Sequence, residues 1–172
     1  MFTPRQQAIS YCLHAMDQHA DRAYPWPGPT LLAVLREAPV PGHPDPTARH
    51  ISVATAPTAA TDLASTDDPV AVLRHAAAHL HNPIVQATFV TATGPVRIVA
   101  WVFMHAAVTD AVDPPQRVRH ISAVDADGTA YLLTRFRDQP EGLIAIDEDP
   151  QAGASEMLDL LRTLARMLHP GT

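Results

Sequence analysis

One segment in the second half of the chain constrains the fold more than any other. Residues 97–108 (RIVAWVFMHAAV) are apolar at nearly every position. As a strand, this segment would carry Ile98, Ala100, Val102, Met104 and Ala106 on one face, and Val99, Trp101, Phe103 and Ala107 on the other. A strand that is apolar on both faces has to be covered on both faces. We therefore predict that helices cover one face of its sheet, and that the proline-rich crossover or a second copy of the chain covers the other.

The remaining pattern predicts an α+β fold, and the length of 172 residues fits a single domain over 1–172. Helical spacing of apolar residues predicts helices over 3–20, 69–80 and about 154–168, and alternation predicts strands over 50–56, 84–93, 96–108, 117–125, 129–137 and 142–146. Residues 31–37 fit a strand or a short helix, and we favour the strand. The expected architecture is a mainly antiparallel sheet of five or six strands, packed by N- and C-terminal helices. A further short helix lies on the connection, and a proline-rich surface loop covers about 38–48.

Four arginines lie on a predicted hairpin around Ala126-Asp127-Gly128. If these three residues form the turn, Ile121 faces Leu133 and Arg119 faces Arg135. Arg117 then faces Arg137 by the same register. A two-residue turn would shift the register by one and divide the arginines between the two faces. The sorting of apolar residues favours the three-residue turn.

Arginines that face one another repel, so this arrangement needs a nearby anion. The anion can be internal, and the candidates are Asp110, Asp113, Asp138, Glu141 and the acidic run 147–149. It can also be external: a phosphate, a carboxylate ligand or an acidic partner protein. Internal ion pairs are the simpler explanation, and Arg117, Arg119, Arg135 and Arg137 are otherwise a candidate anion- or partner-binding site.

A second candidate site is the histidine cluster His75, His79 and His81. Two histidines four residues apart share one face of a helix, and zinc sites use this spacing. A third ligand would come from His81 or from elsewhere in the chain. The alternative is a solvated polar face, because His75 and His79 lie off the apolar stripe of the predicted helix.

Two aromatic or sulfur-bearing residues near the N-terminus have structural explanations. Cys12 falls on the apolar stripe of the first helix, which is typical of a core residue and not of a nucleophile. Trp26 lies in the segment Tyr24-Pro-Trp-Pro-Gly-Pro, which cannot be helical. We expect Trp26 to fold back over the end of the core; the alternative is an exposed recognition segment.

Composition narrows the classes of partner. The net charge is −6, so nucleic-acid binding is disfavoured. All twelve basic residues are arginine, which suggests a GC-rich coding bias. No apolar run reaches the roughly 20 residues of a membrane span, and the first residues do not resemble a secretory signal, so we expect a cytoplasmic protein. The single cysteine excludes an internal disulfide.

Catalytic motifs are missing from the sequence: the seven glycines form no phosphate-binding loop, and there is no GxSxG or HExxH motif. We therefore expect no cofactor, and a non-enzymatic binding, assembly or regulatory protein of a GC-rich bacterium or its phage or plasmid, with a protein partner, self-association or a small anionic ligand. The alternatives are a small metal-dependent enzyme that uses the histidine cluster, and a structural component of a phage particle.

Overall fold

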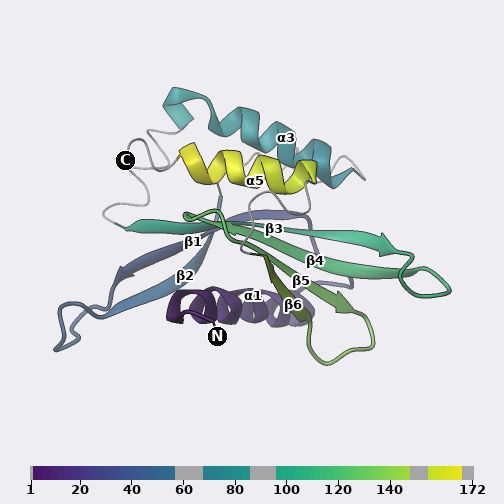
Figure 1. Ribbon diagram of the computed structural model, residues 1–172, viewed down its shortest axis with the longest axis horizontal. Helices are drawn as coiled ribbons and strands as arrows, with labels where there is room; N and C mark the ends of the chain where they lie inside the picture. The colour runs from purple at the N-terminus through teal and green to yellow at the C-terminus, as the bar shows by residue number, and fades with distance from the viewer. Residues whose placement is uncertain (1, 57–67, 86–95, 148–154, 168–172) are drawn as a thin grey trace.

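The fold is a single sheet between two helical layers, as the computed structural model shows (Figure 1). The structure describes residues 2–56, 68–85, 96–147 and 155–167. Helix α1 (Pro4–Ala23) covers one face of the sheet. Helices α3 (Pro69–Leu80) and α5 (Glu156–Met167) cover the other face and pack on each other.

The six strands of the sheet are all antiparallel to their neighbours, in the order β2-β1-β3-β4-β5-β6. Their bounds are β1 Leu31–Pro39, β2 Arg49–Thr55, β3 Arg97–Thr109, β4 Gln116–Asp125, β5 Ala130–Phe136 and β6 Leu143–Asp147. The α+β class, the antiparallel sheet and the terminal helices are as the sequence predicts. Residues 31–37 belong to a strand, which confirms the preferred interpretation.

Strand β3 lies inside the sheet and is buried on both faces. Trp101 and Phe103 pack among residues of α3 and α5, while Val102 and Met104 pack among residues of α1. None of these four side chains is more than 2% exposed. The predicted two-sided burial is confirmed, but the predicted cover is wrong: α1 of the same chain, and not the proline-rich crossover or a second copy, covers the second face.

A β-bulge at the start of β3 changes which face Val99 belongs to. Leu35 pairs with Ala100, but the next residue of β1, Arg36, pairs with Ile98, so Val99 is an extra residue on β3. Val99 and Ala100 both join the α1-side core. Simple alternation placed Val99 beside Trp101, and this assignment is wrong because a bulge breaks the period of two.

Two of the described helices, α1 and α3, begin at capped residues. The Thr3 side chain accepts from the Gln6 backbone and the Gln6 side chain accepts from the Thr3 backbone, which is the predicted capping box. Asp68 caps α3 in the same way through Val70 N. The caps fix the residues at which α1 and α3 begin.

One predicted strand is wrong where it can be compared. Residues 83–85 are helical, so no strand begins at Ile84; the rest of 84–93, and the predicted turn at Gly94-Pro95, lie outside the described residues. The proline that follows Asn82 suits the first turn of a helix, which the apolar pattern alone did not indicate. The predicted loop at 38–48 largely matches the connection between β1 and β2.

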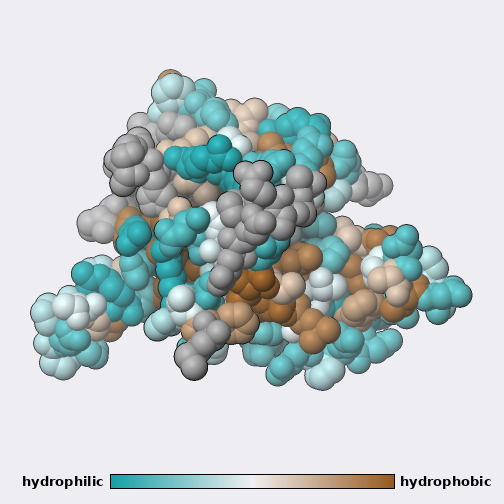
Figure 2. All heavy atoms as spheres, viewed as in Figure 1, coloured by the Kyte–Doolittle hydropathy of each residue, from teal (hydrophilic) through white to brown (hydrophobic). Residues whose placement is uncertain are grey.

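The outer surface is mostly hydrophilic on the helices, and apolar residues gather between the two helical layers, over the sheet (Figure 2). Leu132 on β5 and Leu143 on β6 are large apolar side chains that are 39% and 69% exposed. Within the described residues, no helix combines the length and apolar character required to cross a membrane.

Candidate functional site

The hairpin between β4 and β5 has the predicted three-residue turn. The backbone N–H of Asp125 donates to the carbonyl of Thr129 over 3.0 Å, and Ile121 lies opposite Leu133. Arg119 consequently lies opposite Arg135. The Asp125 carboxylate organises the turn by accepting from the backbone of Asp127 and Thr129 and from the Tyr131 hydroxyl. Burial and the Asp125 charge raise the pKa of Tyr131, so this hydroxyl stays a donor at physiological pH.

Arg119 and Arg135 point into the layer beneath α1, where Asp17 lies between them. The Arg119 guanidinium donates to Asp17 Oδ1 over 2.6 Å and Arg135 donates to Asp17 Oδ2 over 2.8 Å. Asp21, one helical turn later, accepts from Arg135 over 2.8 Å. Arg119 is 0%, Asp17 1% and Arg135 6% exposed. This buried charge network, defined as Asp17, Asp21, Arg119 and Arg135, joins α1 to the hairpin.

The segment that follows α1, at Trp26 and Pro27, contacts Arg119 of the same network. Arg119 Nε donates to the carbonyl of Pro27 over 2.6 Å, and the guanidinium lies 4.9 Å from the centroid of the Trp26 ring. Gly28 has φ of +96°, a backbone conformation that favours glycine, and it lies beside the Arg119 guanidinium. Trp26 thus folds back onto the molecule, over a buried cation, as the sequence analysis favoured over an exposed segment.

The structure brings together only two of the four hairpin arginines. Arg119 and Arg135 are held by α1, so the acids predicted as internal partners are wrong for these two arginines: Asp17 and Asp21 take that role. Arg117 and Arg137 are exposed. An external anion therefore has no open access to the centre of the predicted arginine face.

The histidines of the predicted metal site are all exposed: His75 and His79 lie on α3, and His81 follows its end. The His81 ring lies 2.7 Å from the carbonyl of Ala77, which occupies one of its nitrogens. Among the described residues, no group of three or more histidines, cysteines or acids is placed to hold a metal ion.

A different pair of histidines lies inside the sheet, where His105 is buried and His120 is half-buried. His105 on β3 lies opposite His120 on β4, with ring centroids 5.6 Å apart. The Phe103 ring stacks on His105, and Thr134 contacts the His120 ring over 3.0 Å. Burial lowers the pKa of both histidines, and the neighbouring His105 lowers the pKa of His120 further. Both rings are therefore kept neutral in the folded protein near pH 7.

This pair predicts that acid destabilises the fold before the carboxylates titrate. Because these histidines bind protons at a higher pH in the unfolded chain than in the folded chain, the free energy of unfolding falls as pH falls below about 6.5. The slope is up to about 1.4 kcal/mol per pH unit for one histidine. Urea unfolding from pH 7.5 to 5 measures it.

The control for this prediction is a histidine that is already solvated. His120→Asn should flatten the pH dependence, while His79→Asn, on the exposed face of α3, should leave it unchanged. Parallel pH profiles for the wild type and His120→Asn would contradict the assignment.

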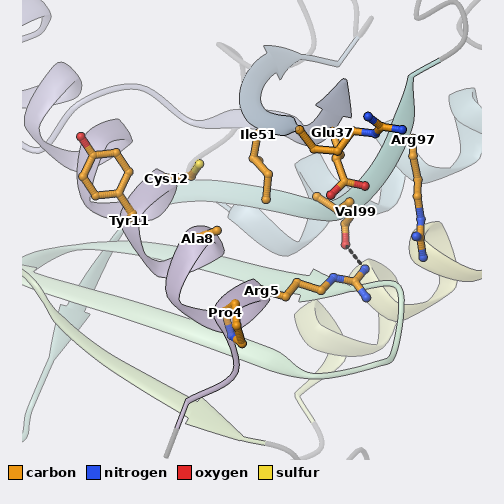
Figure 3. A pocket seen from close by; sticks show the side chains of 10 residues that line it. Pro4, Arg5, Ala8, Tyr11, Cys12, Glu37, Ile51, Arg97 and Val99 are labelled. Carbon is orange, nitrogen blue, oxygen red and sulfur yellow. Dashed lines mark hydrogen bonds between the residues drawn. The ribbon is translucent and has the colours of Figure 1, made fainter. Parts of the chain in front are cut away.

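The strongest candidate for a binding site is a cleft between the N-terminal half of α1 and the ends of three strands (Figure 3). Its volume is about 440 Å³. We call it the basic cleft; its lining residues are Pro4, Arg5, Ala8, Tyr11, Cys12, Glu37, Arg49, Ile51, Arg97 and Val99. It therefore combines three arginines and one acid with a lining that includes apolar side chains.

Each charged residue of the basic cleft comes from a different element. Arg5 lies on the first turn of α1, Glu37 on β1, Arg49 at the start of β2 and Arg97 at the start of β3. Glu37 and Arg97 are direct cross-strand neighbours. In Figure 3 the Arg5 guanidinium and the Glu37 carboxylate approach the bulge at Val99 from opposite sides. The Arg5 guanidinium also lies 3.5 Å from the Val99 carbonyl.

The cleft has spare positive charge. Arg5 forms an ion pair with Asp127 over 2.6 Å, and the Asp127 side chain is 70% exposed. Arg49 donates to the carbonyls of Pro46 and Ala48 and interacts electrostatically with the exposed Asp45. Within the described part of the chain, neither Arg49 nor Arg97 forms an ion pair. When Asp127 and Glu37 are both counted against the three arginines, a formal surplus of one positive charge remains, in a protein whose net charge is −6.

Cys12 lies at the cleft but is 8% exposed, and burial raises the pKa of its thiol. A buried thiol with a raised pKa is largely protonated at neutral pH and is a poor nucleophile. Cys12 is a core residue, as the sequence analysis expected.

Sequence reasoning missed the basic cleft because its arginines are isolated in the chain. Arg5, Arg49 and Arg97 belong to no motif, and only the sheet order β2-β1-β3 brings the last two to one end of the sheet. Known proteins offer no guide to the site: no protein-family description matches the chain, and neither a curated protein nor a solved structure is significantly similar to it.

Proposed function

We propose that this chain is a non-enzymatic binding protein whose basic cleft holds a ligand with an anionic group. The observation that carries the proposal is the convergence of Arg5, Arg49 and Arg97 on one cleft, where neither Arg49 nor Arg97 forms an ion pair within the described residues. The apolar lining beside them gives a ligand both a charged and an uncharged contact. Most small-molecule sites have this combination.

Guanidinium groups favour carboxylates and phosphates because their planar N–H donors match two acceptor oxygens. Arg49 and Arg97 are exposed, so solvent screens them and the interaction should weaken with salt. The net charge of the protein is negative and repels anions, so an anion should bind at this local positive site in preference to the rest of the surface.

Self-association was expected because β3 is apolar on both faces, and α1 now accounts for that feature within one chain. The exposed Leu132 and Leu143 near the free edge of β6 are the surface on which a second copy could still dock. Self-association therefore stays a prediction, which light scattering on the purified protein would test.

The binding proposal is tested with simple anions and paired arginine variants. Titration with butanoate and with inorganic phosphate should produce saturable shifts of the Nε–H signals of Arg5, Arg49 and Arg97 in NMR spectra. Arg49→Gln/Arg97→Gln should weaken butanoate binding at least tenfold, because both unpaired cations are removed. Raising the salt concentration should weaken binding to the wild type.

The matched control is Arg117→Gln/Arg137→Gln, which removes two exposed arginines from the far end of the hairpin. This variant should bind as the wild type does. Unchanged binding by the Arg49/Arg97 variant would refute the proposal, and loss of binding in the control would assign the anion to the hairpin arginines instead.

A further inference from the structure

A second hollow continues the line of the basic cleft along α1. It has a volume of about 350 Å³. We call it the apolar pocket; its lining includes Met16, Leu31, Val53 and Met104, with His19 and Tyr24 at the end of α1. The His19 and Tyr24 rings contact each other edge to face, with centroids 6.3 Å apart.

The two hollows follow the same pair of elements. On α1 the basic cleft uses Ala8 and Cys12, and the apolar pocket continues with Ala15 and His19 at the spacing of one helix face. On β2, alternate residues share one face of the strand, and they line the two hollows in turn: Ile51 lines the cleft and Val53 lines the pocket.

The length of α1 that lines the two hollows is similar to the length of β2 that lines them. From Ala8 to Ala20 the helix rises about 18 Å. From Arg49 to Thr55 the strand extends about 20 Å. The two hollows therefore lie end to end along α1 and β2, and we call the pair the α1 groove: its end near Arg49 is charged and its end near Tyr24 is apolar.

We propose that this groove binds a single-chain amphiphilic carboxylate, with the carboxylate at Arg49 and Arg97 and the aliphatic chain along α1 into the apolar pocket. The inference rests on the proposed function and specifies its ligand. Charge complementarity fixes the orientation, because only one end of the groove carries arginines. Glu37 lies among these arginines and disfavours a doubly charged phosphate more than a singly charged carboxylate.

The apolar pocket suits an aliphatic chain for two reasons. Met16 and Met104 are unbranched and adaptable side chains that can shape themselves around a flexible ligand. Val53 and Tyr24 are 39% and 46% exposed, so a chain in the pocket would remove apolar surface from water.

The test is the dependence of affinity on chain length, measured by calorimetry with butanoate, hexanoate, octanoate and decanoate below their micelle concentrations. Each methylene that enters the pocket should tighten binding about fourfold. Decanoate should therefore bind on the order of 100-fold more tightly than butanoate, even if only part of the chain is covered. Equal affinity for all four acids would overturn the inference while leaving anion binding intact.

Two variants distinguish binding in the groove from nonspecific hydrophobic binding. Ala15 is exposed on α1 and lines the apolar pocket, so Ala15→Phe should fill the pocket, abolish the gain from chain length and leave butanoate binding unchanged. Gln18→Phe adds the same ring at an exposed α1 position outside the lining and should behave as the wild type. Retention of the chain-length effect in Ala15→Phe would overturn the inference, as would tighter binding of decyl phosphate than of decanoate.

Discussion

Replacing Asp17 with alanine should lower the free energy of unfolding by about 3–5 kcal/mol, the range found when one partner of a buried ion pair is removed. Asp17 is 1% exposed and accepts from both Arg119 and Arg135. Without it, two guanidinium groups would lie opposite each other with only the half-exposed Asp21 as an anion. The loss is expected because two buried cations would then be left under-compensated, whether or not the intact network adds net stability.

Urea unfolding of the variant and the wild type measures this loss, and Asp21→Ala is the control. The Asp21 side chain is 42% exposed, so solvent screens its charge and replaces part of its contact with Arg135. Its removal should cost about 1 kcal/mol or less. A cost for Asp17→Ala as small as that for Asp21→Ala would show that the network is not buried in solution.

The second large effect is expected at Phe103. Phe103→Ala should destabilise the protein by about 3–5 kcal/mol, because it opens a cavity between the sheet and the two helices α3 and α5. Phe103 is fully buried, so no solvent can replace the lost contacts. Thermal unfolding monitored by circular dichroism would measure the change.

Val108→Ala is the matched control because Val108 belongs to the same strand but is 72% exposed. It should change the stability by no more than about 0.5 kcal/mol. Similar costs for the two substitutions would mean that α3 and α5 do not cover β3 in solution. This result would contradict the arrangement of one sheet between two helical layers.

Local patterns predicted the parts of the fold that depend on neighbouring residues. The turn at Ala126-Asp127-Gly128 and the pairing of Arg119 with Arg135 follow from the position of Gly128 and the sorting of apolar side chains. Burial of β3 on both faces follows from its composition alone. These features depend on short-range periodicity, which a single sequence contains.

Features that depend on distant contacts could not be predicted in the same way. Asp17 lies on a helix 102 residues before Arg119. Its place on the apolar stripe of that helix indicates burial, but it does not indicate which cations the carboxylate meets. The bulge at Val99 has no glycine to indicate it. The basic cleft combines arginines from three separate elements, so its charge is visible only once the strand order is known.

The strand order also has a consequence for how the chain reaches its native state. Strands β3, β4, β5 and β6 pair with one another in sequence order, so this meander can form through local loop closure. Strand β1 has to find β3 across the long intervening segment that contains β2 and α3, which costs more chain entropy. We therefore expect docking of the β1–β2 hairpin to follow formation of the meander, so both hollows of the α1 groove would be assembled late in folding.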